Sequence, residues 1–297
     1  MEQTGRIYAS IVSRSTIDKG WSGDQKYCAI SENGQKYLLR VSDVDRLSRK
    51  KREYERMKAA AALGISMCLP VEFGVCKEGA YSLQSWIEGR DAESVVLSMR
   101  ADEQYDYGLQ AGRILAKLHT IPAPADMPDW ECRFNEKIDR KIRLYEACEL
   151  KYACGGDAFL RYVEENRHLL AGRKQTYQHG DYHIGNMMID SAGILYIIDF
   201  DRDDFGDPWE EFNRIVWCAQ AAPAFASGMV DGYFGGTVPM DFWKLLALYI
   251  SCNTLSSLPW AIPFGEKQIR VMQKQAVQVL VWYDGMRSVV PTWYQRR

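Results

Sequence analysis

The sequence lacks several features that would assign it to a specialised class of protein. None of its 8 cysteines forms a C-x-x-C pair, so zinc-knuckle and thioredoxin-like sites are not expected. No run of 18 apolar residues occurs, which argues against a transmembrane helix. The N-terminal segment has no apolar core of signal-peptide length. We therefore expect free thiols, a cytoplasmic location and no membrane partner.

The chain also lacks a charge excess of either sign. It has 37 Lys and Arg residues against 39 Asp and Glu residues, a formal net charge of −2. Nucleic-acid-binding domains are usually strongly basic, so no nucleic acid is expected as a partner. The 297 residues, 47% of them hydrophobic, are enough for one large domain or two coupled lobes without disulfide or metal staples. None of these properties predicts an oligomeric state.

The first part of the chain reads as strands with one helix. Asn33-Gly34 separates the β-rich runs 27–30 and 36–41, which predicts a hairpin whose two turn residues both have positive φ. Residues 46–63 are rich in helix formers and contain neither Gly nor Pro, so a helix is expected there.

Beyond these elements the pattern changes from strands to helices. Strands are expected at 71–75 and 81–87, and the polar segment 88–91 then breaks the pattern. Apolar residues recur at helical spacing in most of the remaining chain. We expect an α+β fold with a small N-terminal lobe at 1–87 and a larger, mostly helical C-terminal lobe at 88–297.

The segment 179–207, HGDYHIGNMMIDSAGILYIIDFDRDDFGD, concentrates residues suited to metal chemistry. Ala192-Gly193 lies between two short apolar runs and predicts a hairpin with a two-residue loop. In that register Asn186 lies directly across from Asp199, with Cβ atoms about 4.5–5.5 Å apart; another turn type would shift the register. An amide oxygen and a carboxylate so placed can share Mg²⁺, which prefers oxygen ligands.

Asp181 lies five residues before Asn186, in the polar loop that enters this hairpin. A carboxylate there can accept or orient the proton of an attacking hydroxyl, and with two metal ligands it forms the set that phosphoryl transfer needs. The His179 and His183 pair has the spacing of a helical zinc site. The glycines of this loop oppose a helix, however, and disfavour zinc.

HGDYHIGN and IDFD resemble the signature of the aminoglycoside phosphotransferase and choline kinase superfamily, H-G-D-x-x-x-x-N followed by I-D-F/W-D/E. LAKLHTIP at 115–122 and GDPWEEFNR at 206–214 are also similar to segments of that family. The resemblance implies a bilobal, protein-kinase-like fold with an N-terminal nucleotide-binding lobe and a C-terminal catalytic and acceptor-binding lobe. It implies a kinase that transfers the γ-phosphate of ATP or GTP, with Mg²⁺, to a hydroxyl of an aminoglycoside-like antibiotic or related small molecule.

The resemblance also assigns roles to single residues of the C-terminal half. It implies that Asp181 is the catalytic aspartate, that His179 braces its loop, and that Asn186 and Asp199 hold magnesium. Supporting or acceptor contacts are expected from three further carboxylates: Asp201, Asp207 and Glu211.

The N-terminal half shows the resemblance with one departure. Arg40 stands in YLLRVSD where the family has its phosphate-binding lysine; arginine keeps the charge and can bind phosphate through two N–H groups. Its expected partner is Glu53 on the next helix, with Glu55 as the alternative. Gln84 is expected at the back of the purine pocket. The residues expected to contact the nucleotide are Gly20, Ser22, Gly23, Arg40, Glu53, Ser85 and Ile87.

Other functions remain open from the sequence. Within the same family the acceptor is alternatively choline, another amino alcohol or a sugar metabolite, and the acidic run after Asp199 is either a solvated face or a surface for a cationic acceptor. A metal-dependent hydrolase would use a different ligand set: His179, Asp181, His183, Asp199 and Asp201. A non-catalytic kinase-like binding module is suggested only by the arginine in place of lysine.

Overall fold

The computed structural model describes residues 4–18, 23–153 and 155–296. The chain divides into two compact units, of which unit 1 is Met1–Val95 with Asn186–Asp203, and unit 2 is Val96–Gly185 with Asp204–Arg297. The fold is mixed α+β, with an N-terminal antiparallel sheet followed by a mostly helical region, as expected. Unlike the division at 87/88 drawn from the sequence, the contacts group Asn186–Asp203 with the strand-rich unit.

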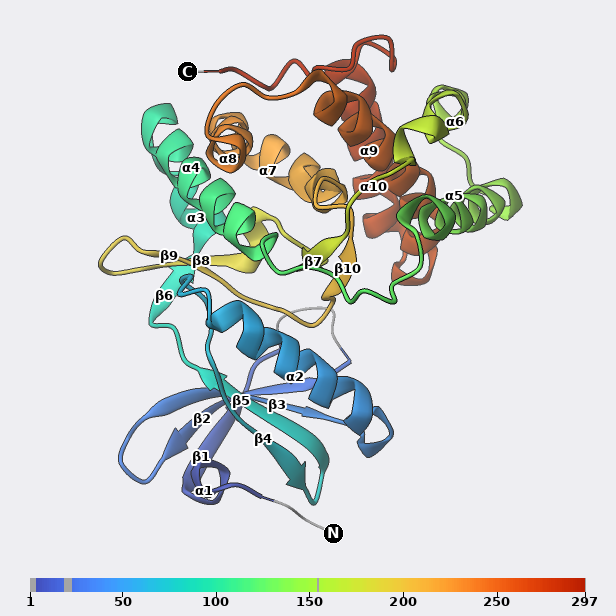
Figure 1. Cartoon of the computed structure of the whole chain (residues 1–297). Coiled ribbons are helices and arrows are strands. Elements are labelled where there is room, and N and C mark those ends of the chain that lie inside the picture. Colours follow the sequence, from blue (N-terminus) through green and yellow to red (C-terminus); the bar gives the residue numbers. More distant parts are fainter. Residues whose placement is uncertain (1–3, 19–22, 154, 297) are drawn as a thin grey trace. The chain divides into compact units, whose positions relative to one another are not determined.

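Unit 1 is built on a five-stranded antiparallel sheet with the strand order β1-β2-β3-β5-β4. Its elements are α1 (Arg6–Ala9), β1 (Ile11–Thr16), β2 (Gln25–Ser31), β3 (Lys36–Ser42), η1 (Val44–Arg46), α2 (Leu47–Ala61), β4 (Pro70–Cys76) and β5 (Gly79–Ser85). Helix α2 packs on β4 and β5 (Figure 1). Alternating apolar residues of β2, β3 and β5, among them Ala29, Leu39 and Leu83, form a buried core.

A second, three-stranded sheet completes unit 1. It consists of β6 (Gly89–Asp91), β8 (Met187–Asp190) and β9 (Leu195–Ile197) in the order β6-β8-β9. The Ile197 N–H donates to the Ser66 carbonyl at 3.0 Å, and the Cys68 N–H donates to the Ile197 carbonyl at 3.2 Å. These two bonds fix the late hairpin to the segment that leads into β4.

Both hairpins of unit 1 turn through three residues, and the two-residue turns predicted from the sequence are wrong. In the β2–β3 hairpin the Ser31 N–H donates to the Gln35 carbonyl at 3.0 Å, and Gly34 has φ +81° while Asn33 does not have positive φ. In the β8–β9 hairpin the Asp190 N–H donates to the Ile194 carbonyl at 3.1 Å, with Gly193 at φ +79°. A three-residue loop needs only its last residue in the left-handed region, and glycine takes that position in both.

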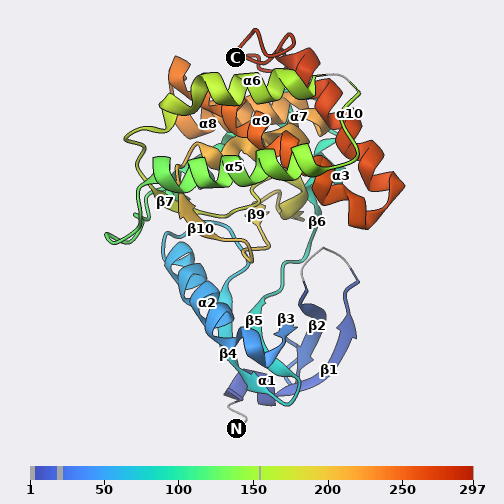
Figure 2. The same cartoon turned by 90° about the vertical axis from the view of Figure 1, so that its right-hand side faces the viewer.

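Unit 2 is mostly helical. Its elements, with two at the joints between the units, are α3 (Ala92–Val96), α4 (Ala101–Leu118), α5 (Trp130–Ala147), α6 (Gly156–Asn166), η2 (Arg167–Leu170), β7 (Thr176–Gln178), η3 (Ile184–Asn186), β10 (Asp204–Gly206), η4 (Glu210–Arg214), α7 (Ile215–Ala221), α8 (Pro223–Phe234), α9 (Met240–Ala261), η5 (Ile262–Phe264) and α10 (Glu266–Trp282). β7 pairs with β10, and α5 and α6 both pack on α9 (Figure 2).

Helix α9 forms the centre of the unit 2 core. The segment Met240–Phe264 is long and apolar enough to cross a membrane by length and composition, which the sequence reading did not anticipate. However, 67% of its most apolar window is buried inside the protein, the setting of a core helix. The cysteines that the structure describes, including Cys252 on this helix, are all free thiols, as expected.

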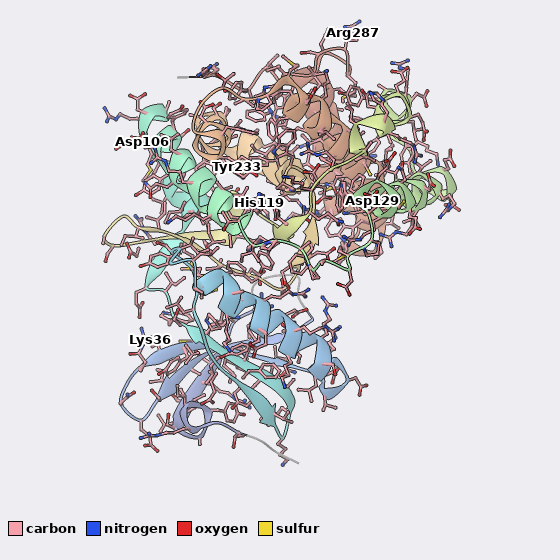
Figure 3. All side chains as sticks on the ribbon, in the orientation of Figure 1. Lys36, Asp106, His119, Asp129, Tyr233 and Arg287 are labelled. Atoms are coloured by element: carbon pink, nitrogen blue, oxygen red, sulfur yellow. The ribbon has the colours of Figure 1, made fainter. Side chains whose placement is uncertain are left out.

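Helices α4 and α8 approach each other at backbone distance because glycines occupy the contact on both sides. A Cβ atom at Gly108 would lie 2.1 Å from the Phe225 carbonyl oxygen, and one at Gly112 would lie 2.1 Å from that of Met229. At the end of α4, the His119 Nδ1 lies 2.9 Å from the Tyr233 hydroxyl of α8 (Figure 3). This helix pair therefore has little tolerance for added volume.

We predict that Gly112→Ala lowers the free energy of unfolding by about 3 kcal/mol, because the new methyl group must push two packed backbones apart. Urea unfolding followed by circular dichroism measures the change. Gly236→Ala is the matched control, since a Cβ there has no neighbour within 4 Å. An equal effect of the two substitutions would contradict the close packing of α4 on α8.

Candidate functional site

The loop that carries Asp181 is held rigidly within unit 2. Glu211 is 2% exposed, and its carboxylate accepts the N–H groups of Gly180 at 3.0 Å and Tyr182 at 3.3 Å. The Asp181 N–H donates to His179 Nδ1 at 3.3 Å, and His179 itself is fully buried. Backbone contacts on both sides of Asp181 therefore fix where its side chain begins.

The Asp181 carboxylate lies among basic side chains of unit 2. Arg214 Nε lies 3.2 Å from Asp181 Oδ1, and His183 Nε2 lies 3.7 Å from the same oxygen. The side chain keeps 20% of its surface exposed. A group of this kind can receive a proton from a small molecule that approaches from solvent.

Asp207 is buried in the interior of unit 2 and hydrogen-bonded there. It is fully buried, and its carboxylate accepts two N–H bonds from Arg173 at 2.7 and 2.9 Å and one hydroxyl bond from Tyr249 at 2.6 Å. The Arg173 guanidinium also stacks over the Trp209 ring, 3.9 Å from its centre. Asp207 and Glu211, two of the carboxylates considered for acceptor contacts, are thus both buried and saturated by neighbours.

Asn186 and Asp199 lie at the same end of the β8–β9 hairpin, but not directly opposite each other. The Ile198 N–H donates to the Asn186 carbonyl at 3.0 Å, so Asn186 faces Ile198. The predicted register is wrong by one residue because the loop has three residues. Asp199 follows with φ +69°, a left-handed conformation that is uncommon outside glycine and often found at functional sites.

The Arg40 guanidinium contacts three carboxylates of unit 1. Its Nη1 lies 2.7 Å from Asp199 Oδ1, its Nη2 lies 2.7 Å from Asp201 Oδ2, and its Nε lies 3.1 Å from Asp24 Oδ2. Its side chain is only 5% exposed. Burial would lower the pKa of Arg40, but the three negative charges outweigh it and raise that pKa, so the guanidinium stays charged.

The expected pairing of Arg40 with Glu53 is wrong. The Glu53 carboxylate pairs instead with Arg49 Nε at 2.7 Å and with Lys50 Nζ at 3.0 Å, both on its own helix α2. Lys50 lies one turn before Glu53, on the same side of α2, and reaches both Glu53 and Asp24. Glu55, the alternative partner, pairs with Lys58 at the surface.

Asp24 takes the place beside Arg40 that the sequence assigned to Glu53. Its side chain is 2% exposed, and it accepts from Arg40, from Lys50 at 2.8 Å and from the Ser42 hydroxyl at 2.7 Å. Burial would raise the pKa of Asp24, but the charges of Arg40 and Lys50 outweigh it and hold that pKa below its ordinary value. The carboxylate therefore stays ionised and holds the guanidinium in place.

A cavity of about 30 Å³ adjoins this cluster in unit 1. Arg40, Lys50 and Glu53 line its polar side, while Phe73 and Phe200 contribute apolar walls. The volume has room for about two water molecules, too little for a purine ring. Gln84 is 6% exposed and also lines this cavity, which is not the purine pocket where the sequence placed it.

Of the other expected nucleotide contacts, the structure describes Gly23, Ser85 and Ile87. Gly20 and Ser22 lie outside the described residues. A Cβ at Gly23 would lie 3.0 Å from Arg46 Nη1. The Ser85 N–H already donates to the Leu69 carbonyl at 2.8 Å, and the Ser85 hydroxyl accepts the Leu69 N–H at 2.8 Å, so the Ser85 N–H is not available to a purine. Ile87 is half-buried in the segment that follows β5.

The donor atoms available for a metal ion are mainly oxygens. Within residues 4–18, 23–153 and 155–296, no group of three or more His, Cys, Asp or Glu side chains is arranged to hold a metal ion. The structure therefore lends no support to the five-ligand set of a hydrolase. An amide oxygen from Asn186 and a carboxylate oxygen from Asp199 fit Mg²⁺, which takes its other ligands from water and phosphate.

Three charged residues of these sites were not singled out from the sequence. Asp24 follows Gly23 directly in the expected nucleotide loop, and Lys50 precedes Glu53 by one helical turn. Arg214 ends the segment GDPWEEFNR, in which only the acidic positions had been assigned a role. In each case a nearby residue was noticed, but the sequence does not show which neighbour makes the contact.

Comparisons with known proteins agree on the fold. A family model described as the phosphotransferase enzyme family matches residues 13–243. A thermostable mutant of aminoglycoside phosphotransferase APH(4)-Ia, in a ternary complex with ADP and hygromycin B, has a TM-score of 0.67 at 15% identity, covering 92% of this chain and 95% of that one. No curated protein is similar enough to the chain to count as a match.

Two further solved structures are similar to a comparable degree. A choline/ethanolamine kinase family protein from Mesorhizobium loti has a TM-score of 0.66 at 15% identity, covering 93% of this chain and 91% of that one. Amicoumacin kinase hAmiN, in complex with AMP-PNP, Ca²⁺ and Ami, has a TM-score of 0.66 at 13% identity, covering 97% and 93%. At such identities the likeness establishes the fold.

We predict that Asp24→Asn lowers the free energy of unfolding at pH 7 by about 1–3 kcal/mol, because Arg40 and Lys50 each lose one of the carboxylates that balance their charge. The pKa of Asp24 is lower in the folded protein than its unfolded value of about 3.9, so its contribution is full at neutral pH and is lost as the pH falls below that value. The difference from wild type should therefore narrow in acid.

Urea unfolding at pH 7 and near pH 3 measures both effects. Asp45→Asn, on the exposed side of η1, is the control. A difference between Asp24→Asn and wild type that is the same at both pH values would show that the charge of Asp24 is not what stabilises unit 1.

Proposed function

The chain belongs to the phosphotransferase enzyme family, and on that premise we propose that it transfers the γ-phosphate of ATP or GTP to a hydroxyl group of a small molecule in the cytoplasm. One observation carries the proposal: Asp181, Asn186 and Asp199 lie in one continuous segment whose backbone is fixed on both sides. Asp181 is held by the Glu211 contacts of unit 2, and Asn186 is held by the hairpin of unit 1.

Asn186 and Asp199 would hold Mg²⁺ through one amide and one carboxylate oxygen. When bound, the ion would neutralise charge on the donor phosphates. The similarity to a kinase structure that holds AMP-PNP and Ca²⁺ supports a nucleotide donor with a divalent cation. The Arg40 guanidinium, which now contacts Asp199 and Asp201, is well suited to bind phosphate oxygens because its planar fork offers two parallel N–H groups.

Asp181 would act on the acceptor. The acceptor hydroxyl oxygen forms a bond to the γ-phosphorus while the bond from that phosphorus to the β–γ bridging oxygen breaks. The electron pair of the broken bond leaves with the nucleoside diphosphate, and the hydroxyl proton passes to the Asp181 carboxylate. Arg214, which contacts Asp181, and Glu211, which holds its loop, would keep the carboxylate aligned.

The acceptor class expected from the family is an aminoglycoside-like antibiotic, with choline, another amino alcohol or a sugar as the alternative. Similar structures contain hygromycin B or Ami, or come from the choline/ethanolamine kinase family. Only an antibiotic acceptor would make the protein a resistance enzyme. Amino compounds are cationic and need open carboxylates, whereas Asp207 and Glu211 are buried and bonded. An assay of candidate acceptors must therefore include neutral and anionic hydroxyl compounds beside the cationic ones.

We predict that Asp181→Asn lowers acceptor-dependent release of nucleoside diphosphate by about 10²–10⁴-fold, because the amide cannot receive the proton. A coupled assay with ATP or GTP and Mg²⁺ measures the release. Calorimetry with AMP-PNP provides the control and should show nearly unchanged nucleotide affinity. A variant that keeps wild-type turnover would exclude Asp181 as the proton acceptor.

We also predict that Asp199→Asn raises the Mg²⁺ concentration needed for half-maximal AMP-PNP binding by about tenfold, because a charged ligand becomes neutral. Calorimetric titration of Mg²⁺ at fixed AMP-PNP measures this without any turnover. Asp43→Asn, an exposed carboxylate of the same unit, should leave the curve unchanged. If both variants bind Mg²⁺ as wild type does, Asp199 is not a metal ligand.

A further inference from the structure

Unit 2 carries a pair of lysines that the proposed transfer does not use. Lys137 and Lys141 are one turn apart on α5 and therefore point to the same side of the helix. Lys137 Nζ lies 2.9 Å from Glu210 Oε1. Among the described residues, the one polar partner of the Lys141 ammonium is the amide oxygen of Asn253, at the long distance of 3.5 Å. Lys141 is half-buried, and no carboxylate of the described residues forms an ion pair with it, although the charge of Glu210 acts on it from a greater distance.

Arg214 links these lysines to the catalytic loop. Its Nε lies 3.2 Å from Asp181 Oδ1, and its charge acts on Lys137, Lys141 and Glu210. We call Lys137, Lys141 and Arg214 the cationic cluster. Its three positive charges face two carboxylates, Glu210 and Asp181, so the group as a whole has one positive charge in excess.

The excess charge is costly to the folded protein. Burial lowers the pKa of Lys141, and the nearby charges of Lys137 and Arg214 lower it further. Burial would raise the pKa of Glu210, but Lys137 and Lys141 outweigh it and hold that pKa below its usual range. A sequence selected for stability alone would place a neutral residue or a second carboxylate here, and local costs of this kind are typical of binding sites.

Polar side chains of α9 lie beside Lys141. Asn253, Ser256 and Ser257 are the half-exposed residues of one side of α9, and α9 packs directly on α5. Both serine hydroxyls donate their one proton to the Asn253 carbonyl, at 3.0 and 2.8 Å, so the donors that this side of α9 offers to an anion are the N–H groups of the Asn253 side chain. The carboxylates that could have balanced the cluster, Asp207 and Glu211, are bound to Arg173 and to the catalytic loop.

We propose that the acceptor carries an anionic group, a carboxylate or a phosphate, in addition to its reactive hydroxyl, and that Lys141 binds this group together with Lys137 and Arg214. The proposal rests on the proposed phosphotransferase function and specifies its substrate class. Placing the anion on the cluster brings the rest of the acceptor toward Asp181, because Arg214 contacts that carboxylate. A strongly cationic acceptor would be repelled by the same three side chains.

Binding of small anions tests the site without any turnover. Inorganic phosphate and acetate are titrated into the full chain, with AMP-PNP and Mg²⁺ present to fill the nucleotide site, and are followed by ³¹P and ¹H line broadening. We expect Lys141→Met to weaken the binding of one or both anions by about tenfold or more, since a charge-assisted contact is lost. Lys141→Arg should retain binding, and Lys117→Met, at an exposed position of α4, should match wild type.

Equal anion binding by wild type and Lys141→Met, or no binding by wild type, would overturn the proposal. The phosphate and acetate arms separate the two kinds of anion. This binding test is valid even if no candidate acceptor is phosphorylated, because it requires no transfer step.

A turnover panel then separates this proposal from the proposed function. Glucose, glucuronate and glucose 6-phosphate share one ring and differ in charge, while kanamycin and choline are cationic. If wild type phosphorylates glucuronate or glucose 6-phosphate and the rate is about tenfold lower in Lys141→Met, the result supports the anionic acceptor. If kanamycin or choline is phosphorylated at the same rate by wild type and Lys141→Met, the anionic acceptor is overturned, while the proposed kinase activity stands. Failure of wild type to bind AMP-PNP would instead count against the kinase itself.

Discussion

The buried guanidinium of Arg40 ties the five-stranded sheet of unit 1 to the hairpin that begins at Asn186. A charge removed from water must meet opposite charge, and Arg40 meets Asp24 from the start of β2 and Asp199 and Asp201 from beyond β9. Arg40 and Asp199 lie 159 residues apart in sequence. The same contacts place the proposed phosphate-binding cation beside a proposed metal ligand, so the stability of unit 1 and its chemistry depend on one cluster.

The same requirement decides how unit 2 uses its acidic residues. Asp207 neutralises Arg173, and Glu210 neutralises Lys137. The Glu211 carboxylate accepts hydrogen bonds from backbone N–H groups of the loop that carries Asp181. Each of these carboxylates is occupied in holding the loop or the helices around it. The cationic cluster beside Asp181 has one positive charge in excess, which the anionic group of the proposed acceptor would balance.

Family membership and fold are established at a coarser level than the acceptor. The segment from Asp181 to Asp199 carries the residues that we propose for phosphoryl transfer, and the described backbone holds both ends of it. The proposed acceptor contacts lie outside that segment, at side chains such as Lys141, and fold likeness at about 15% identity does not specify them.

The sequence by itself determined the α+β class, the strands and the helix between 27 and 87, and the segment that carries Asp181, Asn186 and Asp199, because periodicity and short motifs are local properties. It did not determine the hairpin register, since alternation cannot distinguish a two-residue loop from a three-residue loop ending in Gly34 or Gly193. Only the tertiary structure decided that Arg40 pairs with Asp24 and not with Glu53. Several carboxylates were plausible partners from the sequence, and the choice among them depends on distances of a few ångströms between segments that only folding brings together.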